Sequence, residues 1–207
     1  MLKANYRRKF FLGFVLSAAL MSGCVHRVLA PPSVDLQPYG RIGIFHFSTL
    51  AKGNLGRFAT EKFIESVQSS QPGTPVMELG ILDKVPDPQF LKQIKEKFGV
   101  GAVIVGNLDL SKVTPSASID LSTFVSSMNV RANVEARLLV KLYETEHGAS
   151  LWTRTAHARE SVAQVWLSRD GALSFDASDP EASYGRLVHA LVQTSTYDLR
   201  PHYVRGG

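Results

Sequence analysis

The chain has 207 residues, of which 44% are apolar, with 23 Lys and Arg, 18 Asp and Glu, and a single cysteine. This length suits one domain with a hydrophobic core, and the lone cysteine excludes an intramolecular disulfide and multi-thiolate zinc sites. Four of the cations precede Cys24, which leaves 19 against 18 in the rest of the chain. That near balance argues against a nucleic-acid-binding protein, and no nucleic-acid partner is expected.

The first 23 residues have the pattern of an export signal. A cationic start precedes an apolar run over 10–21 that is too short to span a membrane, and the small Ser22 and Gly23 close it. The stretch 20–24 (LMSGC) resembles the lipobox of bacterial lipoproteins, which implies that Cys24 becomes the lipidated first residue. The alternative is an ordinary cleaved signal followed by a chance cysteine.

The next segment separates the signal from the domain. Residues 24–38 contain Pro31, Pro32 and Pro38, show no hydrophobic periodicity and carry little charge, as is typical of a tether. The expected organisation is therefore a signal peptide over 1–23, a tether over 24–38 and a single domain over 39–207.

The first half of the domain alternates strand and helix patterns. Two amphipathic helices are predicted, one starting at Asn54 as N-cap and one running from Asp87, before Pro88, to a C-terminal Gly99. This alternation favours parallel strands joined by crossover helices. The strand patterns around these helices are 41–47 (RIGIFHF), 75–79 (PVMEL) and 102–110 (AVIVGNLDL).

The clearest pattern is a long strand over 130–142. Every even position is apolar while most odd positions are polar, which predicts one buried and one wet face. A turn over 146–148 and a return strand over 151–158 complete a hairpin, and Asp179 before Pro180 begins a last helix. The predicted fold class is α/β, with a mixed sheet, crossover helices, a long antiparallel hairpin and a C-terminal helix.

Two segments bear on whether the chain could cross a membrane with strands. Residues 111–128 and 161–175 are too short to supply pairs of strands of about 9 to 11 residues each. Both are predicted to be surface hairpins or loops, and the second is expected to fold back at 169–171. The chain itself is therefore not expected to form a pore.

No motif predicts catalysis or cofactor binding. The glycines of 99–106 (GVGAVIVG) lie between a helix and a following strand, whereas a phosphate cradle needs them before a helix. The six histidines include no pair at metal-ligand spacing, and His46 falls within a predicted strand. Asp109 and Asp120 could meet as an acid/base pair, but a strand-end and a loop aspartate are commoner. We predict no catalytic residue, no metal and no cofactor.

Four residues are candidates for an interface. Trp152 could anchor a partner or pack on the sheet. The cations of the wet face could bind an acidic polymer, although Glu135 and Glu144 interrupt them and favour an ordinary solvated face. These candidate cations are Arg131, Arg137 and Lys141.

A family resemblance rests on the lipobox, the RIGIFHF strand, the FGVGAVIVGNL run and the VEARLLVKLYETEHGASLWTRT hairpin. Together they resemble the periplasmic α/β domain of the CsgG-like (curli production and assembly) lipoproteins. That superfamily includes a Pel-polysaccharide ring lipoprotein and penicillin-binding-protein activators. The resemblance spans roughly 39–197 and carries over no catalytic residue.

The resemblance implies a non-catalytic periplasmic lipoprotein that assembles as a ring and acts in the assembly or export of a surface polymer or secreted protein. Its expected partners are further copies of itself and other secretion or envelope-assembly proteins. Val25 stands where many retained inner-membrane lipoproteins carry aspartate, which favours anchoring in the outer membrane. The alternative is a lipid-anchored enzyme acting on cell-wall or surface polysaccharide.

Overall fold

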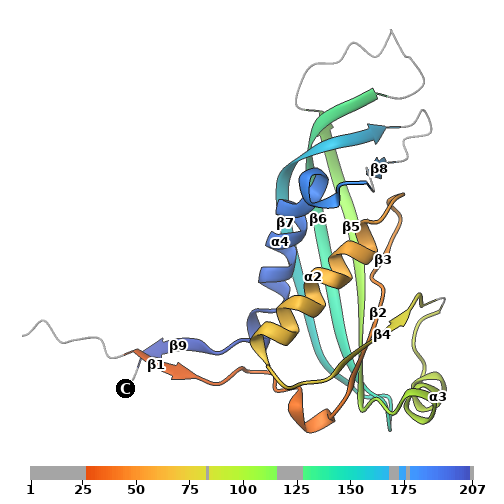
Figure 1. Cartoon of the computed structure of the whole chain (residues 1–207), viewed down its shortest axis with the longest axis vertical. Helices are drawn as coiled ribbons and strands as arrows, with labels where there is room; N and C mark the ends of the chain where they lie inside the picture. The colour runs from red at the N-terminus through yellow and green to blue at the C-terminus, as the bar shows by residue number, and fades with distance from the viewer. Residues whose placement is uncertain (1–26, 83, 116–127, 168–172, 176–177, 206–207) are drawn as a thin grey trace, which may run out of the picture. The chain divides into compact units, whose positions relative to one another are not determined.

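The computed structural model describes residues 27–82, 84–115, 128–167, 173–175 and 178–205 (Figure 1). The described residues divide into two compact units, one containing 27–31 with 202–205 and the other lying within 32–201. None of the helices within the described ranges is long and apolar enough to span a membrane. Cys24 lies outside these ranges.

A mixed sheet with strand order β4-β2-β5-β6-β7-β8 forms the larger unit. Its parallel part joins β2 to both β4 and β5, and a short β3 also pairs with β5. From β5 onward, each pair along the path is antiparallel. The predicted α/β class with a mixed sheet is confirmed. The strands are β2 (Ile42–Phe45), β3 (Ser48–Thr49), β4 (Val76–Gly80), β5 (Ala102–Pro115), β6 (Met128–Glu144), β7 (Ser150–Leu167) and β8 (Leu173–Phe175).

Three α-helices complete this unit. Helices α2 (Leu55–Ser70) and α3 (Pro88–Phe98) are the two predicted crossovers, and α4 (Pro180–Ser195) is the predicted C-terminal helix. Short 3₁₀ turns lie at Gln37–Tyr39 and Tyr197–Leu199.

The helix boundaries follow from local chemistry. Asp87 accepts a hydrogen bond from the Phe90 N–H at 2.7 Å, and Asp179 accepts one from the Ala182 N–H at 3.0 Å, so both aspartates cap their helices as predicted. Gly99 ends α3 in the left-handed conformation with φ of 65°. Asn54 occupies the predicted N-cap position of α2, but its side chain makes no capping bond.

Two hydrophobic clusters lie on opposite faces of the sheet. The main core packs α2 and α4, which contact each other, against alternate residues such as Ile104 and Leu138 (Figure 1). Tyr184 of α4 lies edge-on to Phe58 and Phe175, each with ring centroids 5.3 Å away. The smaller cluster packs Leu91 of α3 on the intervening residues of the strands, including Phe45 and Val103. Much of the second face beyond α3 therefore lacks a helix among the described elements.

Gln71, at the C-terminal end of α2, holds the two ends of the larger unit together. Its amide oxygen accepts a hydrogen bond from the Leu36 N–H at 2.8 Å, and its amide nitrogen donates to Val34 O at 2.6 Å and Leu199 O at 3.0 Å. In addition, the Val34 N–H donates to Asp198 O at 3.0 Å. The chain therefore enters and leaves this unit at adjacent points.

The long hairpin extends further than the sequence predicts. The return strand expected over 151–158 is too short, because β7 continues to Leu167 and pairs with the first half of β6 as far as Met128. Likewise, 111–115 continue β5, and Pro115 lies opposite Ala132. The predicted fold-back within 161–175 is present as the β7–β8 pair, while 116–127 and 168–172 lie outside the described residues.

The smaller unit contains a two-stranded antiparallel ribbon of β1 (Arg27–Ala30) and β9 (His202–Arg205). The sequence predicts neither strand. Residues 27–30 fall within the segment interpreted as a tether, and 202–205 follow Pro201, where the domain was expected to close. The two strands are separated by most of the chain, so no local pattern identifies their pairing.

Candidate functional site

The wet face of the hairpin is the first candidate surface. Along β6 the even positions from Val134 to Leu142 are buried, as predicted, while Arg137 is exposed and Lys141 is half-buried. Arg137 Nη2 lies 3.3 Å from Asp109 Oδ2 on β5, and Arg159 Nη1 of β7 lies 3.4 Å from Glu135 Oε1. The face therefore carries pairs of opposite charge across neighbouring strands.

The proposed acid/base pair is not brought together by the described residues. Asp109 is paired with Arg137, and Asp120 lies outside the described ranges. Arg131 is part of β6, next to a register shift between Val130 and Ala132, and its side chain is likewise outside the description.

A cavity of about 360 Å³ opens on the same face beside the loop between β4 and α3. Lys141 contributes a cation to it, and Lys84, whose Nζ lies 3.6 Å from Asp87 Oδ2, contributes a second. A side-chain hydrogen bond joins His46 and Glu78. The hydroxyl of Ser48, which also lines the cavity, donates to Gly106 O at 3.3 Å. The cavity offers cations and hydrogen-bond donors, and its serine is bonded to the backbone.

Trp152 is engaged within its own unit. Its ring is half-buried and packs against the main core, and its Nε1 donates to Asp198 Oδ2 at 3.1 Å. Arg154 Nη1 lies 3.2 Å from the same carboxylate oxygen. The structure thus places this candidate interface residue in an intramolecular network, which hydrophobic patterning alone does not reveal.

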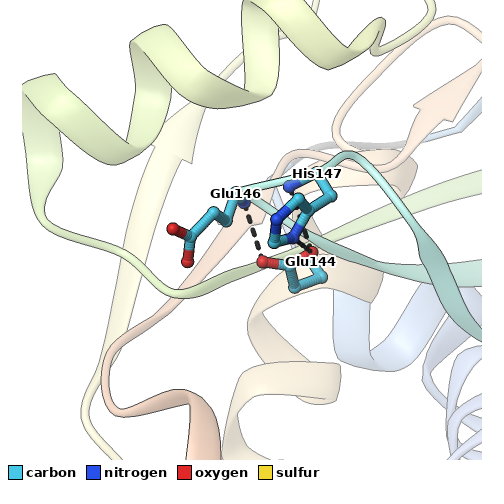
Figure 2. A group of neighbouring side chains, drawn as sticks. All are labelled: Glu144, Glu146 and His147. Carbon is cyan, nitrogen blue, oxygen red and sulfur yellow. Dashed lines mark hydrogen bonds and ion pairs between the residues drawn. The ribbon is translucent and has the colours of Figure 1, made fainter.

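The turn between β6 and β7 gathers three potential metal ligands (Figure 2). One side-chain ligand atom from each of Glu144, Glu146 and His147 lies within 4.8 Å of the others. The Glu144 carboxylate, however, accepts hydrogen bonds from the Glu146 N–H at 2.9 Å and the His147 N–H at 3.1 Å. Glu146 Oε2 lies 3.0 Å from Lys95 Nζ. Each carboxylate therefore already has a structural partner.

The pKa values at this turn reflect those partners. Burial disfavours the charged form of Glu144, but the backbone N–H groups and the His147 side chain outweigh it and lower the Glu144 pKa. The side chain of Lys95 lowers the pKa of Glu146. Both groups are therefore stabilised as carboxylates by contacts that hold the hairpin turn and join it to α3.

No protein-family model matches the chain, and no curated protein matches it. Among solved structures, it is similar to PelC from Paraburkholderia phytofirmans, solved as a dodecamer, with 11% identity, a TM-score of 0.47, and 86% of this chain and 98% of that chain covered. It is also similar to lipoprotein GNA1162 from Neisseria meningitidis, with 16% identity, a TM-score of 0.39, and coverage of 59% and 83%.

A third similar structure is the LpoB C-terminal domain from Salmonella enterica, with 11% identity, a TM-score of 0.36, and coverage of 59% of this chain and 84% of that chain. The similar structures thus include a bacterial lipoprotein. At these identities the likeness does not assign a function, and membership of the CsgG-like superfamily stays a prediction.

Proposed function

We propose that this chain is a non-catalytic lipoprotein of the CsgG-like superfamily, held at the periplasmic face of the outer membrane by acyl groups on Cys24. It acts there as a ring-shaped homo-oligomer in the assembly or export of a surface polymer or secreted protein. The lipobox and Val25 support the location. The main observation in support of an oligomer is the open edge of β7.

The β7 strand has a long edge available for pairing. On one side it pairs with β6 along most of its length, whereas on the other side β8 pairs only with Val165–Leu167. Across the described residues, the remaining part of that second side, over 150–164, has no strand partner. Arg186 of α4 donates to one carbonyl oxygen along this stretch, that of Ser161, at 3.3 Å. An edge of this length is a template for backbone pairing with another chain.

The other end of the sheet supports a ring in particular. The outermost strand there is β4, a parallel strand of five residues that differs from β7 in direction and surroundings. Contact between the β7 edge of one copy and the β4 edge of the next joins two different surfaces. Such heterologous contacts repeat, and they close into a ring where the rotation between copies allows it.

The charged face supports a role in binding over one in catalysis. Asp109, Glu135 and Glu146 are each paired with a cation, and Glu144 holds the hairpin turn. The enzyme alternative depends on a carboxylate poised for proton transfer, and Asp109, its candidate within the described residues, is engaged with Arg137.

Cysteine crosslinking tests the ring. In a chain produced without residues 1–23 and carrying Cys24→Ser, cysteines are introduced at the exposed Thr155 of β7 and Glu78 of β4, singly and together. The double variant is expected to give a ladder of crosslinked species beyond the dimer under mild oxidation, while each single variant gives none. A matched control combines Glu78→Cys with Arg57→Cys on the exposed face of α2.

Two outcomes contradict the proposal. Crosslinked dimers from Thr155→Cys alone indicate a two-fold contact between β7 edges, which does not extend into a ring. Light scattering on the chain without introduced cysteines measures its mass at high protein concentration. A strictly monomeric mass would show that no oligomer forms.

A further inference from the structure

The β1–β9 ribbon lies close in sequence to the proposed lipid anchor. Its first residue, Arg27, is three residues after Cys24. Three extended residues span at most about 10 Å. If Cys24 is held in a bilayer by its acyl groups, the start of β1 cannot lie further than about this distance from the membrane surface. This step rests on the proposed lipid anchoring.

The ribbon exposes much apolar surface for its size. Four large apolar side chains among its eight residues are exposed: Leu29 by 56%, Tyr203 by 69%, Val28 by 43% and Val204 by 40%. An isolated two-stranded ribbon is only marginally stable in water. The exposed side chains therefore mark a surface that a further layer would stabilise.

The register places apolar and cationic positions on one face. Arg27 lies opposite Arg205, and Leu29 lies opposite Tyr203. Directly opposed residues share a face, and positions two apart along a strand do too. One face therefore combines both arginine positions with the two most exposed apolar side chains of the ribbon. Like charges directly opposite each other disfavour strand pairing.

This combination matches a membrane interface. Tyrosine is enriched at the level of lipid headgroups, where its ring contacts the acyl boundary and its hydroxyl stays hydrated. Each basic residue near an anionic membrane surface adds to the binding affinity. A single lipid attachment combined with a basic, apolar surface anchors more firmly than either alone.

We propose that the β1–β9 ribbon is a second membrane attachment, which docks on the anionic headgroup layer of the bilayer that receives the Cys24 acyl chains. Leu29 and Tyr203 enter the boundary of the acyl region, and the register positions of Arg27 and Arg205 fall on the same face of the ribbon. The C-terminal segment thereby takes part in membrane binding although it is almost the entire chain away from Cys24.

Vesicle sedimentation without the acyl anchor tests this attachment separately from lipidation. A chain produced without residues 1–23 and carrying Cys24→Ser is mixed with vesicles of phosphatidylglycerol and phosphatidylethanolamine, and in parallel with phosphatidylcholine vesicles. Binding to the anionic vesicles is expected, with weaker binding to phosphatidylcholine and a decrease as salt is added. Replacing Arg27 and Arg205 together by glutamine should weaken binding to the anionic vesicles about 30-fold.

Further variants distinguish vesicle binding by the ribbon from nonspecific binding by exposed apolar side chains. Leu29→Asp and Tyr203→Asp should each remove vesicle binding, whereas Leu50→Asp, at a 99% exposed leucine of the larger unit, should leave it unchanged. Circular dichroism confirms that each variant keeps the larger unit folded. As a second measurement, hydrogen exchange of the Leu29 and Tyr203 amides in the lipidated chain should be slower in anionic bilayers than in detergent.

Three results overturn the proposal. One is a folded Cys24→Ser chain that does not sediment with anionic vesicles. Another is equal loss of binding in Leu50→Asp. The third is a change in oligomer mass, without a change in vesicle binding, on replacing Leu29 or Tyr203, since this identifies a second copy as the occupant of the ribbon face. None of these results affects the labelling of Cys24 by fatty acid, which is measured independently.

Discussion

The indole nitrogen of Trp152 donates a hydrogen bond to Oδ2 of Asp198 at 3.1 Å and so fixes β7 to the turn that follows α4. The same carboxylate lies 3.2 Å from Arg154 Nη1, so one acidic group serves two neighbours on β7. The main-chain oxygen of Asp198 also accepts the Val34 N–H. Trp152 therefore stabilises the unit from within.

The first prediction concerns this network. Trp152→Phe keeps a ring in the same place but removes the donor, so the free energy of unfolding should fall by about 1 to 2 kcal/mol. Urea denaturation of the Cys24→Ser chain measures the change. Thr153→Ala, at the exposed neighbouring position, is the control and should change stability by less than about 0.5 kcal/mol. Unaltered stability in Trp152→Phe, together with a loss of oligomer, would restore the interface interpretation.

The second prediction concerns the anchor. Because the thioether to the lipid requires the cysteine sulfur, Cys24→Ser should abolish incorporation of radiolabelled palmitate, and the protein should stay unprocessed or be released from the membrane. Autoradiography of the immunoprecipitated protein measures the label. Unchanged labelling of the variant would show that the lipid is attached elsewhere or that 20–24 is not a lipobox.

The third prediction concerns close packing at the entry to β5. A Cβ added at Gly101 would collide with the main-chain carbonyl of Tyr39, which cannot move without displacing the backbone. Gly101→Ala should therefore destabilise the unit by about 1 to 3 kcal/mol in urea denaturation. Gly43→Ala is the matched control, since the nearest atom to its new Cβ is Leu79 Cδ1, at the end of a flexible side chain. Equal losses in both variants would contradict this account.

The fourth prediction concerns acid. Because the folded-state pKa of Glu144 lies below its ordinary value of 4.5, its contribution to stability is present above pH 4.5 and is lost as the pH falls through the folded-state value. Glu144→Gln removes this titration, so its stability should decline less steeply than that of the wild type below about pH 4.5. Denaturation midpoints at several pH values measure the slopes.

The control for this pH dependence is Glu61→Gln, which removes an exposed carboxylate of α2 paired with Arg57. A slope in Glu144→Gln indistinguishable from that of the wild type would mean that the turn is not held by the charged carboxylate.

Local chemistry explains which parts of the fold could be predicted. Asp87 and Asp179 each precede a proline and cap the helix that follows, and the alternation along β6 identifies its buried face from one strand alone. These features depend on residues that are neighbours in sequence. The α/β class and both crossover helices could be predicted for the same reason.

The remaining features depend on partners distant in sequence. The outer part of β7, from Arg159 onward, alternates poorly and becomes a strand because β6 supplies hydrogen bonds along its length. β1 and β9 are four residues each and form only as a pair. The Trp152–Asp198 bond joins residues 46 positions apart, so the sequence offered Trp152 as an interface candidate without indicating its partner.

The bonds made by Gln71 also determine how the larger unit would bear mechanical load. Tension from an acylated Cys24 would enter it near Val34 and Leu36, and both are bonded to the Gln71 side chain, which also holds Leu199. Within the larger unit, the first contacts to yield under tension would therefore be the hydrogen bonds of this amide, before the strands of the sheet begin to separate. Breaking the Gln71 hydrogen bonds would free the segments at residues 34–36 and at Leu199 while the sheet and its helices remain intact.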